Sequence, residues 1–271
     1  MASCPVQAPT WWSIPPIRTS RRDAVFGSLG WQELATVRGE ALYRAPDGVG
    51  LDALLSVMGG TGRTAYLALM KVGKPVAGDT LVISGAAGAT GSLVGQLGKI
   101  AGCRVIGIAG GAEKCAWLTG ELGFDAAIDY KGEKVRSRLR ELCPNGVDVF
   151  FDNVGGEILN DVLARLALGA RVVICGAISR YNFDPRSPDM PEGPRNYFNV
   201  VFTGATIQGF LASHYERDFP EADARLAGWV RDGRISASAD LLPGFESAPA
   251  ALMRLFEGGN RGKQLVRLTE T

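Results

Sequence analysis

An apolar run that leads directly into a glycine-rich turn places the tightest constraint on the fold of this chain. Leu81–Gly91 has the sequence LVISGAAGATG, and a helix-forming stretch follows it. Small residues at such a turn let the backbone bend tightly, approach a pyrophosphate and pack helix against strand. The N–H groups at the start of the helix then face the phosphates. The segment predicts a dinucleotide-binding Rossmann unit, although similar glycine-alanine turns occur in α/β proteins that bind no nucleotide.

The composition describes a globular chain without a strong electric field. Its 271 residues are 46% hydrophobic, which is ample for a packed core. Lys and Arg number 29 against 28 Asp and Glu, so the net charge is +1. Because no excess charge attracts nucleic acid or an anionic membrane, a small-molecule substrate is the favoured partner.

Cysteine usage and hydropathy predict a cytoplasmic protein without a membrane partner. Each apolar stretch is interrupted before it reaches the roughly 18 residues of a membrane span. Residues 1–23 lack the apolar core of a secretory signal and contain Pro15-Pro16, so we expect an irregular segment there. The cysteines are odd in number, lie far apart and are expected to be free thiols: Cys4, Cys103, Cys115, Cys143 and Cys175.

From Thr80 onward, β-type runs alternate with helix-type stretches. Each β-type run is continuously apolar, as expected for strands covered on both faces. The pattern predicts an α/β fold with a doubly wound parallel Rossmann sheet. The expected strands lie in Leu81–Ser84, Arg104–Gly110, Ala126–Tyr130, Val147–Gly156, Ala170–Ser179 and Ala205–Ala212, and the expected helices are Ala89–Ala101, Ala112–Leu122, Glu133–Leu142 and Glu157–Leu166.

The flanking segments have a different character. Ala24–Arg44 predicts short antiparallel strands, typical of the tail of a β-rich domain. Asp52–Val72 predicts two helices with a break at Gly59–Gly62, the second running from Arg63 to Met70. The remaining expected elements are a surface loop at Asp184–Pro194, helices at Glu221–Val230 and Glu246–Glu257, and a closing strand at Lys263–Leu268.

The end of the second strand of the Rossmann unit favours NADPH over NADH. In NAD-binding units an acid about 20 residues beyond the glycines binds the ribose 2′-hydroxyl. Here that place is Ala109-Gly110-Gly111, without a carboxylate, and Lys114 follows in the first helical turn. A cation there can meet a 2′-phosphate. The alternative is that Lys114 is an ordinary solvated residue at the start of a helix.

Several strings in the same order carry a family resemblance. They are GAAGATGSLVGQLGKIAGCRVIGIAGGAEKCAWLTGELGFDAAIDYK, FFDNVGGEIL, VVICGAISRYN and GNRGKQLVRL. From about Ala24 to Leu268 the chain resembles the zinc-independent medium-chain dehydrogenase/reductases, in the branch of leukotriene B4 12-hydroxydehydrogenase/prostaglandin reductase, curcumin reductase and plant double-bond reductases. The resemblance implies NADPH-dependent reduction of the carbon–carbon double bond in α,β-unsaturated ketones or aldehydes.

The resemblance also implies cofactor contacts, residue by residue. Lys114 matches the partner of the 2′-phosphate, and Tyr130 lies in a D-Y-K string where relatives usually have N-Y-K. Asn153 in D-N-V-G-G matches a nucleotide contact, and Asn260 a late one. The other implied contacts are Gly88, Ala89, Thr90, Gly91 and Ser92 at the pyrophosphate turn, Cys175, Gly176, Ala177, Ile178, Ser179 and Tyr181 beside the nicotinamide, and Phe210 and Leu211 beside cofactor and substrate.

The chemistry of such a site is mainly positioning, because the cofactor supplies the hydride. As the hydride reaches the β-carbon of an enone, negative charge builds on the carbonyl oxygen, and a hydroxyl donor stabilises it. Tyr181 is the candidate catalytic donor, with the ribose 2′-hydroxyl as co-donor. The alternative is a tyrosine that only packs against the edge of the cofactor.

Other chemistries lack their residues. Zinc catalysis of the alcohol-dehydrogenase type needs Cys and His ligands, but the single histidine, His214, has no cysteine near it in sequence. We therefore expect no metal site and a loop position for His214. A serine hydrolase would need a G-x-S-x-G elbow, which the chain lacks.

The chain departs from the family at its beginning. Relatives start with most of a GroES-like β-barrel, and residues before Ala24 do not match it. We therefore expect an N-terminally truncated member, in which residues 24–72 and 235–271 are the remnant of the GroES-like catalytic domain and residues 73–234 form the NADP-binding Rossmann domain. Gly60-Thr61-Gly62-Arg63 also replaces a Met-Pro-Gly-Leu string, which leaves the substrate size open.

Three functions remain open on the sequence. An enone or enal reductase is the main hypothesis, and a truncated, catalytically impaired NADPH-binding protein and a quinone oxidoreductase are the alternatives. Relatives usually form dimers by joining sheet edges. We therefore expect a homodimer with Ala205–Phe210 at the seam, unless that segment is an ordinary internal strand.

Overall fold

A six-stranded parallel sheet organises the larger part of the computed structural model, which describes residues 25–45, 49–184, 186–187 and 193–268. The strand order is β5-β4-β3-β6-β7-β8, so the direction of winding reverses between β3 and β6. The doubly wound parallel sheet is confirmed. Its strands are β3 (Thr80–Ser84), β4 (Arg104–Ala109), β5 (Ala126–Asp129), β6 (Val147–Asp152), β7 (Leu166–Ile174) and β8 (Thr206–Gly209).

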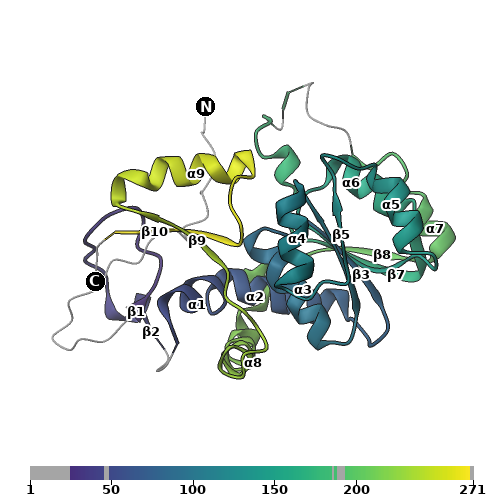
Figure 1. Ribbon diagram of the computed structural model, residues 1–271. Helices are drawn as coiled ribbons and strands as arrows, with labels where there is room; N and C mark the ends of the chain where they lie inside the picture. Colours follow the sequence, from purple (N-terminus) through teal and green to yellow (C-terminus); the bar gives the residue numbers. More distant parts are fainter. Residues whose placement is uncertain (1–24, 46–48, 185, 188–192, 269–271) are drawn as a thin grey trace.

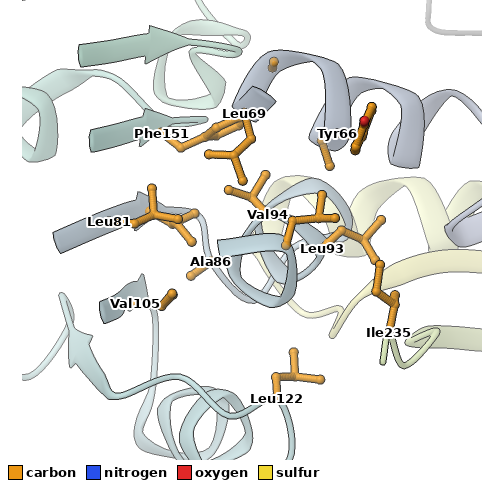
Figure 2. Close-up of a cluster of buried hydrophobic side chains, with 14 of the residues drawn as sticks. Tyr66, Leu69, Leu81, Ala86, Leu93, Val94, Val105, Leu122, Phe151 and Ile235 are labelled. Carbon is orange, nitrogen blue, oxygen red and sulfur yellow. The ribbon is translucent and has the colours of Figure 1, made fainter. Parts of the chain in front are cut away.

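Helices cover both faces of this sheet (Figure 1). On one face, α3 (Ala89–Ile100) and α4 (Ala112–Gly120) bury side chains in a cluster with Leu81 and Phe151. Figure 2 shows part of this cluster, where Val94 of α3 lies near Leu69 and Phe151. On the other face, α5 (Val135–Leu142) and α6 (Gly156–Leu163) pack with Val82 and Phe150. Neighbouring residues of one strand therefore face opposite clusters, as the continuously apolar strands predict.

Three glycines let α3 lie close to the sheet. A Cβ at Gly95 would lie 1.9 Å from the ring of Phe124, and one at Gly98 would lie 2.4 Å from Leu81. At Gly91 a Cβ would lie 2.4 Å from the carbonyl oxygen of Gly85, in the turn that precedes the helix. Because these places are already filled, larger residues would push the helix away from the strand and its turn.

A smaller lobe lies beside the sheet, around α9 in Figure 1. Its strands β9 and β10 pair in parallel, and β1 pairs antiparallel with β2. The isolated bridge between Gly88 and Gly262 connects this lobe to the glycine-rich turn. The elements around it are β1 (Val25–Phe26), β2 (Tyr43–Arg44), α1 (Leu51–Ser56), β9 (Ala239–Pro243), α9 (Ala248–Glu257) and β10 (Lys263–Arg267).

Some predicted boundaries were wrong. The second early helix, α2, is Gly60–Leu67 rather than beginning at Arg63, and it continues as the π-helical segment η2 (Ala68–Gly73). Gly62 is needed inside α2 because a Cβ there would lie 1.6 Å from the carbonyl oxygen of Val57. Strand β7 begins at Leu166, four residues before the predicted start, and β9 was not predicted.

Helix α8 (Phe219–Arg231) packs against α2 and is joined to it by an ion pair. The guanidinium of Arg63 donates two hydrogen bonds to the carboxylate of Asp223, at 2.7 and 2.6 Å, and lies over the ring of Phe219.

The segment predicted at residues 1–23 lies outside the described residues. Within the described part, no helix is both long and apolar enough to cross a membrane.

Replacing Gly95 with alanine tests the close approach of α3. We expect the free energy of unfolding to fall by about 1–3 kcal/mol, because the new methyl group overlaps the ring of Phe124. Urea denaturation measures the change. Gly228→Ala in α8 is the control: its Cβ meets nothing within 4 Å, and stability should stay equal or rise by up to about 1 kcal/mol. Equal effects of both changes would contradict the packing.

Candidate functional site

The glycine-rich turn presents unpaired backbone donors at the start of α3. Gly88 is the N-cap of this 12-residue helix and makes no side-chain cap hydrogen bond. The first intrahelical bond runs from the N–H of Ser92 to the carbonyl of Gly88, at 3.0 Å. The N–H groups of Ala89, Thr90 and Gly91 therefore have no intrahelical partner. Such a helix start attracts phosphate oxygens through its donors and its dipole.

The backbone conformation of this turn and the atoms packed against its glycines show that a dinucleotide fits it. Gly85 has a φ of +58°, which glycine adopts without strain, and a Cβ at Gly88 would lie 3.2 Å from the carbonyl oxygen of Gly85. The backbone is thus bent as tightly as a pyrophosphate turn requires. The residues present fit the phosphates of a dinucleotide, with Gly88 to Ser92 as their predicted contacts.

A buried hydrogen-bond network joins β3 to β6 at the reversal of strand order. The hydroxyl of Ser84 donates to the carboxylate of Asp152 at 2.6 Å and accepts from the N–H of Asn153 at 2.8 Å. The Asn153 amide donates to the carbonyl of Ser84, also at 2.8 Å. Asp152 further accepts the N–H groups of Val154 and Gly155 at 3.0 Å. The network fixes the D-N-V-G-G turn against the end of the strand that carries the glycine turn.

The carboxylate of Asp152 has little contact with solvent, and burial is the largest influence on its pKa. Burial raises the pKa of Asp152, while the hydrogen bonds from Gly155, Ser84 and Val154 lower it only in part. Sequence analysis did not single out Ser84 or Asp152. The available signal was a polar residue at the end of each of two apolar strands.

The C-G-A-I-S-R-Y loop is tied to the D-N-V-G-G turn. The N–H of Ile178 donates to the carbonyl of Asn153 at 3.1 Å. The hydroxyl of Ser179 donates to the carbonyl of Val154 at 2.5 Å. The N–H groups of Cys175 and Gly176 donate to the carbonyl of Asp152. The structure therefore brings the predicted residues at 153 and 175–179 together at one edge of the sheet.

Tyr181 closes this loop with its hydroxyl group. The N–H of Ala177 donates to the phenolic oxygen at 3.3 Å, and a Cβ at Gly176 would lie 3.1 Å from that oxygen. The ring is 61% exposed. The oxygen accepts from Ala177, and among the described residues it donates its own proton to no acceptor.

Phe210 and Leu211 follow β8 at the same edge of the sheet. The N–H of Phe210 donates to the carbonyl of Ile174 at 3.0 Å, and its buried ring stacks on Tyr215. Leu211 is exposed. Phe210 thus continues the pairing with β7, whereas the side chain of Leu211 is available to a ligand.

Lys114, Tyr130 and Asn260 lie around the end of β4. Lys114 donates to the carbonyl of Gly258 at 2.7 Å, and the ring of Tyr130 lies against the backbone of Gly110. Asn260 is buried and donates to the carbonyl of Gly262, whose N–H bonds the carbonyl of Ala87. The three predicted contacts therefore border the glycine turn and the turn after β4.

Lys263 is a buried polar residue that sequence analysis missed. Its ammonium donates to the hydroxyl of Thr61 at 3.1 Å, next to the Gly262 contact with the glycine turn. Burial lowers the pKa of Lys263 to about 8. No sequence motif marks Lys263, because its burial depends on the contact between α2 and β10 in the folded chain.

The described residues do not fit a metal centre. Among them, no group of three or more His, Cys, Asp or Glu side chains is placed to hold an ion. His214 lies exposed in the 3₁₀ segment η4 (Ala212–Asp218), a short helix rather than the predicted loop. The four cysteines of the described part are free, and burial raises the pKa of the Cys175 thiol to about 12.

Comparison with known proteins agrees with this geometry. A family model described as zinc-binding dehydrogenase matches residues 89–228. The protein YfmJ of Bacillus subtilis is 44% identical over 250 residues, which cover 92% of this chain and 73% of that protein. The NADPH-dependent curcumin reductase of Escherichia coli is 36% identical over 248 residues, 91% of this chain and 72% of that enzyme.

A solved structure extends the similarity to three dimensions. CurA from Vibrio vulnificus, determined in complex with NADPH, matches with a TM-score of 0.81 and 40% identity. The match covers 89% of this chain and 72% of CurA. The fold and the turn define an oxidoreductase with a dinucleotide-binding Rossmann unit. The chain belongs to the medium-chain dehydrogenase/reductase family, in the branch of the curcumin, alkenal and prostaglandin reductases.

An Asp152→Asn variant tests the burial of the carboxylate. An unfolded aspartate releases its proton near a pKa of about 3.9, whereas folded Asp152 keeps its proton to higher pH. The free energy of unfolding contributed by Asp152 therefore falls as pH rises through that interval. Urea denaturation between pH 4 and about 7 should show the wild type losing stability relative to the variant. A wild-type advantage that grows with pH would mean that the three donors outweigh burial.

Proposed function

We propose that this protein reduces the carbon–carbon double bond of α,β-unsaturated ketones or aldehydes with NADPH. The observation that carries the proposal is the joined pair of loops, D-N-V-G-G and C-G-A-I-S-R-Y, at the carboxyl edge of the sheet beside the glycine turn. Parallel sheets bind their ligands at this edge, where the winding reverses. The relatives include NADPH-dependent curcumin reductase and 2-alkenal reductase.

Different groups of the chain bind different parts of the cofactor. The first N–H groups of α3 hold the pyrophosphate, Lys114 and Tyr130 hold the 2′-phosphate, and residues 175–181 lie along the nicotinamide. Bound NADPH would supply the hydride for the β-carbon of the enone, and solvent would supply the proton for the α-carbon. The protein contributes mainly the alignment of the acceptor carbon and the exclusion of water.

Tyr181 is the proposed catalytic donor. Its free O–H proton is available to the carbonyl oxygen of the enone, which gains negative charge when the hydride arrives. The loop that carries Tyr181 is fixed through Asn153 and Val154, so the donor is positioned before the substrate binds.

Two alternatives to this function remain, and the turnover test below distinguishes them. The chain matches 74% of the length of Escherichia coli quinone oxidoreductase, at 19% identity, so that similarity supports only the fold. NADPH binding without efficient turnover is the second alternative.

The proposed assembly is a cytoplasmic homodimer that joins through the edge of the sheet. In the described part of the chain, strand β8 is one of the two edge strands of the six-stranded sheet, not an internal strand, and Ile207 on it is exposed. The neighbouring helix α7 (Asn199–Thr203) exposes Val201 and Phe202. An exposed apolar strip along an unpaired edge strand is suited to a second copy of the chain.

Turnover with a cofactor and substrate panel tests the proposed function. We expect oxidation of NADPH, but not of NADH, in the presence of small enones and enals, and slower reaction with quinones. A preference for quinones would replace the proposal with the quinone activity. Tight NADPH binding without any turnover would identify a cofactor-binding protein.

A Tyr181→Phe variant tests the donor. Loss of one donor to a developing oxyanion lowers kcat about 100-fold, while the Kd of NADPH should stay within the error of fluorescence titration. An unchanged kcat would mean that the ring of Tyr181 only packs against the cofactor. The exposed Tyr197→Phe change is the control and should leave both quantities unaltered.

A further inference from the structure

Two lysines follow the paired strands β4 and β5 at the carboxyl edge of the sheet. Lys114 is in the first turn of α4, after β4, and Lys131 follows β5. Burial lowers the pKa of Lys114, and the positive charge of Lys131 lowers it further. The carboxylates of Asp240 and Glu113 raise the pKa of Lys114, but its pKa stays lowered. Positive charge that its surroundings do not fully balance is a feature that an anion would stabilise.

The two turns form one unit through Asp129. Its Oδ1 atom accepts the N–H of Gly111 at 2.7 Å, in the turn before α4, and the N–H of Lys131 at 3.0 Å. These hydrogen bonds, that of Gly111 first, hold the pKa of Asp129 below its usual range. The N–H of Tyr130 also donates to the carbonyl of Ala109 at 3.1 Å. Lys131 therefore has a fixed backbone beside the turn that carries Lys114.

The position of this unit indicates which anion it takes. It lies at the end of the second strand of the Rossmann unit, where the 2′ position of the adenosine ribose is bound. A phosphate monoester carries close to two negative charges at neutral pH. Lys114 alone neutralises one of them, and it also donates to the carbonyl of Gly258. A second cation is needed to balance the dianion. The exposed Lys131 lies in the turn after β5, which Asp129 joins by hydrogen bonds to the turn before α4.

We propose that Lys131 is a specificity-determining residue, the second cation for the 2′-phosphate of NADPH, and that Asp129 positions it. The inference rests on the proposed use of NADPH and deepens it. Asp129 has two opposing effects: its hydrogen bonds order the turn, and its negative charge repels the phosphate. An asparagine at this position keeps the accepting oxygen for both N–H groups and removes only the charge.

Equilibrium binding of NADPH and NADH to the full chain tests the role of Lys131. For Lys131→Met we expect the Kd of NADPH to rise about tenfold, since one charge-assisted hydrogen bond is lost and salt screens this exposed one. The Kd of NADH, which lacks the 2′-phosphate, should not change. Lys134→Met is the matched control, because this exposed lysine lies three residues further along and should alter neither value.

The Asp129→Asn variant gives the opposite expectation. Its Kd for NADPH should fall severalfold, with the Kd for NADH unchanged, because a repulsive charge is removed while the hydrogen bonds remain. The NADPH-to-NADH ratio is a readout that a purely structural role of either residue would not move. Equal changes for both cofactors, or no change, in Lys131→Met would overturn the inference.

The same titration separates this inference from the proposed function. If the wild-type chain binds NADPH no better than NADH, the proposed cofactor use fails and the inference fails with it. If the wild type prefers NADPH and Lys131→Met keeps the full preference, only the inference about Lys131 is wrong.

Discussion

The hydrogen bond between Ser84 and Asp152 is the interaction on which the site depends. It joins β3 to β6 at the one place where the winding of the sheet reverses, and both side chains are buried there. Through Asp152 it orders the D-N-V-G-G turn, and through that turn the loop with Tyr181. A carboxylate in such a position costs free energy unless it is fully bonded, so its three donors, Ser84, Val154 and Gly155, keep these loops in one arrangement.

Charge is distributed along the carboxyl edge of the sheet in a simple way. The free N–H groups of α3 provide partial positive charge at the centre, and Lys114 and Lys131 provide full charges toward β5. The side toward β7 and β8 contains residues 175–181, Phe210 and Leu211, with few charges. The positively charged side suits the phosphates of the cofactor. The side with few charges suits its uncharged ring and the substrate.

Much of the fold followed from local sequence, but contacts between distant segments did not. The continuously apolar runs predicted the parallel strands, because both faces of each are covered. Strand β9 was missed because Ala239–Pro243 is short, ends in proline and, among the strands of the described residues, pairs with β10 alone. The start of α2 was missed because Gly60 and Gly62 are poor helix formers, yet Gly62 is required by its contact with Val57. Ser84 and Asp152 are 68 residues apart, so no local pattern links them.

Hydrogen–deuterium exchange of the full chain with and without NADPH tests the central claim most directly. The account predicts slower exchange in residues 85–92, 110–114, 129–132, 153–156 and 175–181, because these turns meet at one edge of the sheet and surround the cofactor. Exchange in α5, on the opposite face, should be unchanged. Protection that omits these turns, or that spreads evenly over the chain, would contradict the proposed site.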